Sequence, residues 1–251
     1  MPYANNNGVR VHYEVEGTGP PLVLIHGFLA DLEYWRQLGY VEALKSSYRV
    51  ISIDMRGHGQ SDKPHEPAEY GETQRVGDIL AVLDAEGVQR AHVWGYSKGG
   101  IDGFLLAHHA PERVASLITG GIAARSTASR PATIKLVEAG IDAVVKAFAS
   151  GPPMASFASR VATNDPDALL ACAHAAGRSL EDIHPTIQAP CLMYVGENDV
   201  PYATAPQTAR TMPNATFVGL PGLNHPEGWA RSDLVLPHVT AFLAKVTEAE
   251  S

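Results

Sequence analysis

The sequence predicts an α/β fold: a doubly wound, mostly parallel sheet with an N-terminal antiparallel hairpin and an inserted helical cap. Short apolar runs recur along the chain, as is typical of strands buried on both faces of a parallel sheet. Segments with a helical period separate these runs. Between residues 123 and 189 the alternation stops and Ala-rich helical stretches replace it. We therefore expect residues 1–122 and 190–251 to form one core, and residues 123–189 to form the cap.

The first strands are expected to form the hairpin. Val9–Val15 alternates with a period of two, and the turn-forming residues Asn5 to Gly8 precede it. The later strands are expected at Pro21–Ile25, Arg49–Ile53, Ala91–Trp94, Val114–Ile118, Cys191–Val195 and Ala215–Leu220. In a sheet of this kind, ligands bind at the carboxyl ends of the parallel strands.

Helices are expected between the strands and in the cap. The core helices are expected at Thr73–Ala85, Ile101–His109, Thr204–Met212 and Leu234–Val246. In the cap, helical stretches are expected at Ala132–Ala149 and Pro166–Ala176, because proline residues at 152, 153 and 166 end or begin helices.

The composition excludes several classes of protein. At 251 residues, with 45% hydrophobic and 18% charged residues, the chain has the composition of one soluble globular core. A net charge of -8 without a Lys/Arg cluster argues against nucleic acid or an anionic membrane as a partner. We expect a small-molecule substrate that is neutral or apolar, and the oligomeric state is left open.

The sequence predicts no metal and no cofactor. The two cysteines, Cys172 and Cys191, lack metal-ligand spacing, and we expect both thiols to be idle. No secretory signal pattern begins the chain, and no apolar stretch approaches the roughly 20 residues that span a bilayer. These observations predict a cytoplasmic protein.

One pentapeptide carries the strongest chemical signal. Gly95-Tyr96-Ser97-Lys98-Gly99 lies between an expected strand and an expected helix. The pattern G-x-S-x-G needs small residues on both sides of the serine, because strand, turn and helix crowd together there. Ser97 is therefore a candidate nucleophile.

A serine hydroxyl needs a base within hydrogen-bond reach and a third group that orients the base. His225 follows the last expected strand on a Gly/Pro loop, and Asp199 follows the strand before it. Both therefore project from the same sheet edge as Ser97. Two alternatives remain open at this point: Glu197 as the acid and His238 as the base.

The chain order Ser, Asp, His resembles the α/β-hydrolase fold superfamily. His26-Gly27-Phe28 and the segment from Asp54 to Asp62 add to the resemblance, which covers nearly the whole chain outside the cap. The resemblance implies that Ser97 is the nucleophile, Asp199 the orienting acid and His225 the base. It also implies an oxyanion hole made by the backbone N–H groups of Phe28 and Lys98.

Three other polar residues in these motifs are expected to be structural. We interpret His26 and His58 as parts of the family's loop patterns. Asp54 is expected to accept hydrogen bonds from loop N–H groups. Lys98 departs from the family pattern, which usually has an apolar or amide residue there, and its side chain is expected to pair with a carboxylate such as Glu197 or to reach solvent.

The serine argues against the haloalkane dehalogenase and epoxide hydrolase branches, which the chain resembles but which use an aspartate at this position. The chain looks like small esterases and lactonases such as 3-oxoadipate enol-lactonase. This resemblance implies cleavage of a small carboxylic ester or lactone through an acyl-enzyme. A cofactor-free perhydrolase or haloperoxidase, a C–C bond hydrolase and a slow-turnover ligand receptor remain alternatives on the same triad. The cap and pocket decide between such activities.

The cap supplies the remaining candidates for substrate binding. Its apolar residues predict an acyl pocket of modest size. Four arginines could hold a substrate carboxylate if one points inward, although most are expected to be solvated: Arg125, Arg130, Arg160 and Arg178.

Overall fold

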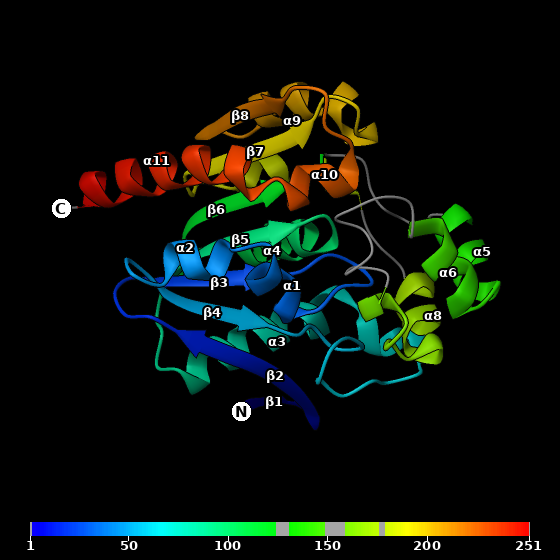
Figure 1. Cartoon of the computed structure of the whole chain (residues 1–251). Coiled ribbons are helices and arrows are strands. Elements are labelled where there is room, and N and C mark those ends of the chain that lie inside the picture. Colours follow the sequence, from blue (N-terminus) through cyan, green and yellow to red (C-terminus); the bar gives the residue numbers. More distant parts are fainter. Residues whose placement is uncertain (1, 124–130, 149–158, 176–178, 251) are drawn as a thin grey trace.

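The computed structural model describes residues 2–123, 131–148, 159–175 and 179–250. One eight-stranded sheet runs through the described part of the chain in the order β1-β2-β4-β3-β5-β6-β7-β8 (Figure 1). The strands are β1 (Tyr3–Asn6), β2 (Val9–Glu16), β3 (Pro21–Ile25), β4 (Arg49–Ile53), β5 (Ala91–Tyr96), β6 (Val114–Gly120), β7 (Cys191–Gly196) and β8 (Ala215–Leu220). The β1–β2 and β2–β4 pairs are antiparallel, and all the others are parallel. The predicted fold class is therefore confirmed.

The N-terminal hairpin is closed by a two-residue turn. Asn7 and Gly8 connect β1 to β2 with φ values of 52° and 92°. Both residues lie in the left-handed region, as the tight turns that match the twist of paired strands require. The Asn-Gly dipeptide therefore sets the register, in which Asn6 lies opposite Val9.

The sheet separates two layers of helices, as Figure 1 shows. On one face lie α1 (Leu32–Gln37), α2 (Tyr40–Leu44), α10 (His225–Ala230) and α11 (Ser232–Glu250); on the other lie α3 (Glu72–Ala85), α4 (Lys98–His109) and α9 (Ala205–Thr211). Alternate residues of β3 pack into different layers: Leu22 and Leu24 face α1 and α2, and Val23 and Ile25 face α3 and α4. Both faces are buried, which explains why these strands are apolar throughout.

The short connections include 3₁₀ turns at η1 (Pro67–Tyr70), η2 (Pro111–Arg113), η3 (His184–Thr186) and η4 (Val200–Ala203). Two short helices, α1 and α2, were not expected from the sequence. The stretch expected at Ala132–Ala149 contains two helices, α5 (Pro131–Glu138) and α6 (Ile141–Phe148). Gly140, with a φ of 96°, lies between them, and a glycine in this conformation ends a helix.

The helices α5, α6 and α8 (Pro166–His174) lie beyond the carboxyl ends of the parallel strands (Figure 1). Their buried residues Val137, Val144 and Leu169 belong to the same apolar cluster as Leu29, which lies in the loop after β3. The cap helices therefore pack against the edge of the sheet where ligands are expected. The exact boundaries of core and cap stay a prediction.

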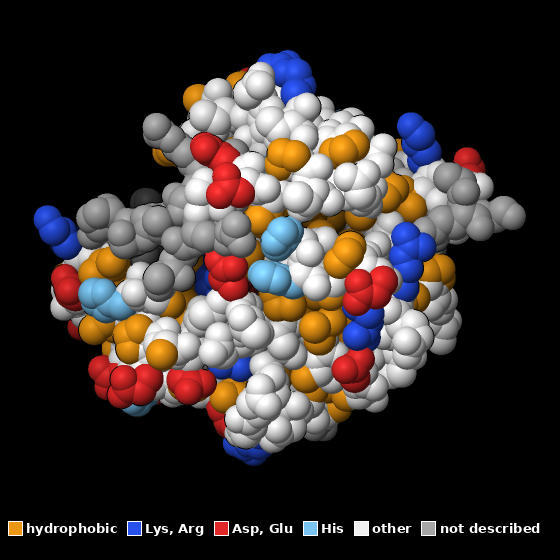
Figure 2. Space-filling model, turned by 180° about the vertical axis from the view of Figure 1, so that it is seen from behind, with side chains coloured by type: hydrophobic (Ala, Val, Ile, Leu, Met, Phe, Trp, Pro, Cys, Tyr) orange, Lys and Arg blue, Asp and Glu red, His pale blue; other side chains and the backbone are white. Residues whose placement is uncertain are grey.

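The face that is hidden in Figure 1 carries charged side chains of both signs and apolar side chains. In Figure 2, Lys and Arg side chains are scattered among Asp and Glu side chains on this face, and apolar side chains form small separate groups. Within the described ranges, no helix combines the length and the apolar character that crossing a bilayer requires.

Candidate active site

The serine of the pentapeptide lies in a strained turn between β5 and α4. Ser97 has φ 53° and ψ -114°, a conformation that a residue with a side chain seldom adopts. A Cβ atom on Gly95 would lie 2.1 Å from the carbonyl oxygen of Gly99, and one on Gly99 would lie 2.2 Å from that of Ile25. Both glycines are therefore required sterically, as the sequence pattern predicted. Such strain costs about 1 to 3 kcal/mol and persists because the surrounding structure enforces it.

Three predicted residues form one chain of hydrogen bonds. The Oγ atom of Ser97 lies 3.0 Å from Nε2 of His225, and Nδ1 of the same imidazole lies 2.7 Å from Oδ2 of Asp199. Because a carboxylate accepts and cannot donate, Nδ1 donates to Asp199. Nε2 is then free to accept the hydroxyl proton of Ser97. This arrangement can activate the serine as a nucleophile.

The two alternatives for acid and base lie elsewhere. Glu197 is exposed, and its Oε2 accepts a hydrogen bond from the backbone N–H of Gly222 at 3.3 Å. His238 is exposed on α11. Asp199 is the N-cap residue of η4, in the turn that follows β7; it is 8% exposed, and its carboxylate faces His225.

His225 lies on a helix rather than on the expected loop. It is the first residue of α10, and Asn224 and Glu227 form a capping box around it. The Asn224 side chain accepts from the Glu227 N–H at 3.1 Å, and the Glu227 carboxylate accepts from the Asn224 N–H at 3.0 Å. The spacing Asn-x-x-Glu is a recognised start signal for a helix and was the signal that could have placed His225 correctly.

An aromatic group, not anticipated from the sequence, supports the imidazole. The hydroxyl of Tyr96 donates to the carbonyl of His225 at 2.5 Å. The Tyr96 ring stacks on Trp229 at 4.9 Å between ring centroids, and Trp229 meets Tyr34 and Trp35 edge to face at 4.8 and 5.0 Å. The neighbour of Ser97 in the pentapeptide thus fixes the backbone of His225, which limits how far the imidazole can move.

The two residues of the expected oxyanion hole come from segments that lie next to Ser97. Lys98 begins α4 directly after the serine, and the loop that contains Phe28 lies close to it, since a Cβ atom on Gly27 would lie 3.5 Å from Cβ of Ser97. In the described part of the chain, neither the Phe28 nor the Lys98 N–H has a protein acceptor. Both donors are therefore free for a substrate oxygen.

The side chain of Lys98 pairs with a carboxylate, as one of the two expectations had it, but the partner is not Glu197. Its Nζ lies 3.0 Å from Oδ2 of Asp102, one turn further along α4. Asp102 is fully buried and also pairs with Arg75. Burial would raise the pKa of Asp102, but the charges of Arg75 and Lys98 outweigh it and hold this pKa below its ordinary value. A buried carboxylate on the same helix thus holds the Lys98 side chain in place.

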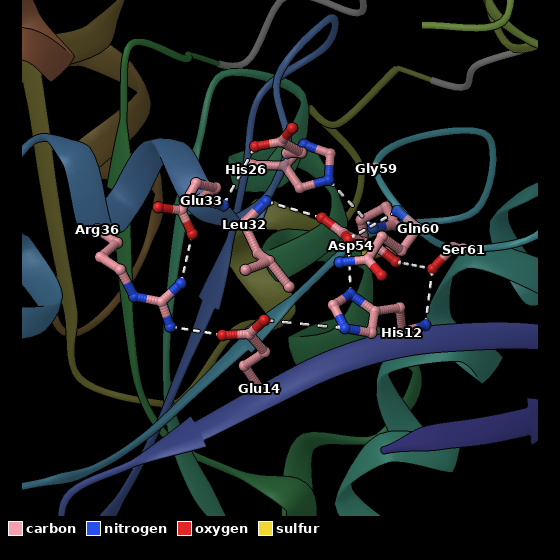
Figure 3. Close-up of polar contacts among 12 residues, drawn as sticks. His12, Glu14, His26, Leu32, Glu33, Arg36, Asp54, Gly59, Gln60 and Ser61 are labelled. Carbon is pink, nitrogen blue, oxygen red and sulfur yellow. Dashed lines mark hydrogen bonds and ion pairs between the residues drawn. The ribbon is translucent and has the colours of Figure 1, made fainter. Parts of the chain in front are cut away.

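Asp54 holds the loops beside the site in place (Figure 3). Its carboxylate accepts from Nδ1 of His12 at 2.8 Å, from the N–H of Leu32 at 2.8 Å and from the N–H of Gln60 at 2.9 Å. Burial would raise the pKa of Asp54, but these donors and His26 hold it below its ordinary value. The expected role of Asp54 in binding loop N–H groups is confirmed.

The two histidines next to the glycines make structural contacts. Nε2 of His26 accepts from the N–H of Met55 at 3.0 Å, and its Nδ1 donates to the carbonyl of Gly27 at 2.8 Å. Burial lowers the pKa of His26, which fits the neutral tautomer that these bonds require. His58 is buried against His26, and burial also lowers its pKa.

Only one of the four cap arginines can be placed. Arg160 forms an ion pair with Asp31 at the start of α1. The others, Arg125, Arg130 and Arg178, lie outside the described residues.

Within the described ranges, one group could offer three ligands to a metal ion: His65, Asp165 and Asp167, with ligand atoms within 4.8 Å of one another. Asp165 already caps α8 by accepting from the N–H groups of Asp167 and Ala168, and its other oxygen lies 3.1 Å from Nε2 of His65. We interpret this group as a helix cap with an ion pair.

Of the two cysteines, Cys191 is buried in β7, and burial raises the pKa of its thiol to about 12 and keeps the thiol protonated.

The chain is similar to several curated proteins. It is 42% identical over 117 residues to the candidate carbamate hydrolase RutD of Azorhizobium caulinodans, and 35% identical over 115 residues to epoxide hydrolase 3 of Siraitia grosvenorii. These matches cover 47% and 45% of this chain, and 43% and 36% of the two relatives. The chain therefore matches less than half the length of each.

Solved structures match over a much larger share. The enol-lactonase of Burkholderia xenovorans superposes with a TM-score of 0.84 at 28% identity, over 97% of this chain and 100% of the other. A hydrolase of Pseudomonas aeruginosa also reaches 0.84, at 26% identity, over 96% and 97% of the two chains. Residues 20–150, which make up more than half of the chain, match the alpha/beta hydrolase fold family. The protein belongs to the α/β-hydrolase fold family.

Proposed function

We propose that this protein is a serine hydrolase that cleaves a small carboxylic ester or lactone through an acyl-enzyme. Ser97 is the nucleophile, His225 the base and Asp199 the acid that orients the base. The observation that carries the proposal is the chain of hydrogen bonds from Ser97 through His225 to Asp199, at 3.0 and 2.7 Å. Its members follow three different strands, β5, β8 and β7, and meet at the carboxyl edge of the sheet.

In the first half of the reaction, Oγ of Ser97 attacks the carbonyl carbon and its proton passes to Nε2 of His225. The negative charge on the carbonyl oxygen is held by the N–H groups of Phe28 and Lys98, each worth about 10² to 10³ in rate. The bond to the leaving oxygen then breaks, and that oxygen takes the proton from His225. In the second half, water attacks the acyl group by the same route, and Ser97 regains its proton.

A serine nucleophile favours acyl substrates over epoxides. Opening an epoxide with Ser97 would form an ether between Oγ and carbon, which water activated by a histidine does not cleave. An acyl group on Ser97 is an ester, which water can hydrolyse and so release the enzyme for another cycle. The likeness to an enol-lactonase at 28% identity supports a lactone or ester as the substrate class.

A panel of p-nitrophenyl esters and lactones with graded acyl lengths tests the proposal. We expect steady turnover that is fastest for one narrow range of acyl size. Release of one p-nitrophenol per chain followed by near silence, with the acyl group retained on Ser97, would contradict an enzyme and favour a ligand receptor. Activity that depends on added peroxide would instead favour a perhydrolase.

A further inference from the structure

The turn that carries the Phe28 N–H has an unfavourable sequence for its shape. The N–H of Ala30 donates to the carbonyl of Gly27 at 3.3 Å, which closes a four-residue turn. Leu29 occupies its third position with a φ of 72°, where glycine or asparagine is usual. A residue with a branched side chain keeps this conformation only when contacts outside the turn hold it there.

On the core side, the loop is fixed at both ends. Nδ1 of His26 donates to the carbonyl of Gly27 at 2.8 Å, and the N–H of Leu32 donates to Asp54 at 2.8 Å. Figure 3 shows His26 and Leu32 beside Asp54, with a dashed line between Leu32 and the Asp54 carboxylate. These contacts bracket the turn but do not touch Leu29.

On the other side, the contacts come from the cap. Nδ2 of Asn164 donates to the carbonyl of Leu29 at 3.0 Å. Nε of Arg160 donates to Oδ1 of Asp31 at 2.7 Å, and its Nη2 donates to the second oxygen of the same carboxylate. The Asp31 side chain is only 10% exposed, so this two-pronged pair is partly shielded from water and stronger than an exposed one.

We propose that Arg160 and Asn164 are positioning residues that hold the Phe28 N–H in line with the substrate oxygen. The inference rests on the proposed function, because it assigns Phe28 to the oxyanion hole. Arg160 and Asn164 act through the loop and need not touch substrate. The seating of this cap segment on the core therefore sets how well the oxyanion is stabilised.

A third contact of the same cap segment supplies a matched control. Nε2 of His65 lies 3.1 Å from Oδ2 of Asp165, which joins the segment to the core through a residue outside the turn. His65→Gln changes this docking contact and leaves Arg160, Asn164 and Asp31 themselves unchanged. A general effect of cap docking and a specific effect on the oxyanion loop can thus be separated.

The kinetic test compares Arg160→Met, Asn164→Leu and Asp31→Asn with the wild type on one activated ester. We expect kcat and the rate of phosphonate labelling of Ser97 to fall by about tenfold or more, with KM changed much less, because an oxyanion donor acts in the transition state. Arg160→Lys should restore part of the loss, and His65→Gln should leave kcat unchanged. Asp31→Asn keeps the cap of α1, since asparagine also caps helices, and so guards against misfolding.

Hydrogen exchange supplies a readout that does not depend on turnover. Amides of residues 26–31 should exchange at least about tenfold faster in Arg160→Met and Asn164→Leu, and at the wild-type rate in His65→Gln. Unchanged exchange in this loop, or unchanged kcat in an active enzyme, would overturn the inference. If the wild type neither turns over esters nor labels at Ser97, the proposed function fails, and the exchange rates still decide whether the cap positions the loop.

Discussion

The Nε2 atom of His225 lies 3.0 Å from the Oγ atom of Ser97, although 128 positions of sequence separate the two residues. Each partner is fixed by its own local structure: Ser97 by a strained turn between two required glycines, and His225 by the capping box of α10. The contact therefore forms as the fold forms and needs no substrate to assemble it. Such a preformed pair is what a serine nucleophile requires.

Replacing the base should be about as damaging as replacing the nucleophile. We expect His225→Ala to lower kcat by at least about 10⁴-fold, and the double variant with Ser97→Ala to lose little more, because triad members act as a unit. Steady-state hydrolysis of an activated ester measures both. His238→Ala, which changes an exposed histidine on α11, is the control and should retain wild-type activity. High activity in His225→Ala would place the base elsewhere.

Neutralising the acid should preserve the fold and slow the reaction. Asp199→Asn replaces the carboxylate with an amide whose NH2 group can donate to Nδ1 of His225, which leaves the imidazole proton on Nε2, so kcat should fall by as much as about 10⁴-fold. Glu197→Gln is the matched control, because Glu197 contacts Gly222 and not the imidazole. Kinetics and thermal melting of both variants test this prediction. It is wrong if Glu197→Gln is the slow enzyme.

Removing the charge of Lys98 should have a small effect on catalysis. Lys98→Met leaves the backbone N–H in place, so kcat on a neutral ester should stay within roughly tenfold of the wild type. Asp102 retains its pair with Arg75 in this variant. Esters with and without a carboxylate should be tested side by side. A loss confined to the anionic ester would make the ammonium a substrate-binding group, and a loss of about 10²-fold on the neutral ester would contradict a backbone-only role.

His184 should make the protein sensitive to mild acid. It is fully buried against Phe104, and burial lowers its pKa from 6.5 to about 4. Below pH 6.5 the unfolded chain binds a proton that the native state does not, so the free energy of unfolding falls as the pH drops from 6.5 to 4. His184 alone lowers the free energy of unfolding by about 3 kcal/mol between pH 6.5 and pH 4.

Urea denaturation of His184→Phe at pH 7 and at pH 4 measures this contribution. Buried carboxylates such as Asp54 and Asp102, whose pKa values are lowered, lose their contribution only at a still lower pH and do so in both proteins. The variant should therefore lose less stability than the wild type between pH 6.5 and pH 4. Equal losses in the two proteins would show that His184 does not titrate as its burial predicts.

Much of the sheet could be predicted from the sequence because burial on both faces leaves a plain pattern. The buried strands β3 and β4 begin and end at the predicted residues, since apolar runs bounded by loops define them, and so does the half-buried edge strand β8. The position of Ser97 followed from the same logic. Steric crowding permits only glycine at positions 95 and 99, two residues before and after the serine, so the shape of the turn can be recognised in the sequence.

Other features left weaker signals. The helices α1 and α2 have six and five residues, too few to display a helical period. Lys98 meets Asp102 rather than Glu197 because the two residues lie one turn apart on the same helix, whereas Glu197 faces Gly222. The pair between Arg160 and Asp31 joins cap to core, and no local pattern records such a tertiary contact.

The most direct test of the proposed chemistry is to trap the acyl-enzyme and locate it. Wild-type protein treated with an organophosphonate, or quenched during turnover of an ester, should gain the mass of one adduct per chain, and peptide mapping should place it on Ser97. Ser97→Ala should gain no adduct and should lose nearly all hydrolysis, because the acyl bond needs the hydroxyl. An adduct on another residue, or wild-type hydrolysis by Ser97→Ala, would contradict the assignment of Ser97 as the nucleophile.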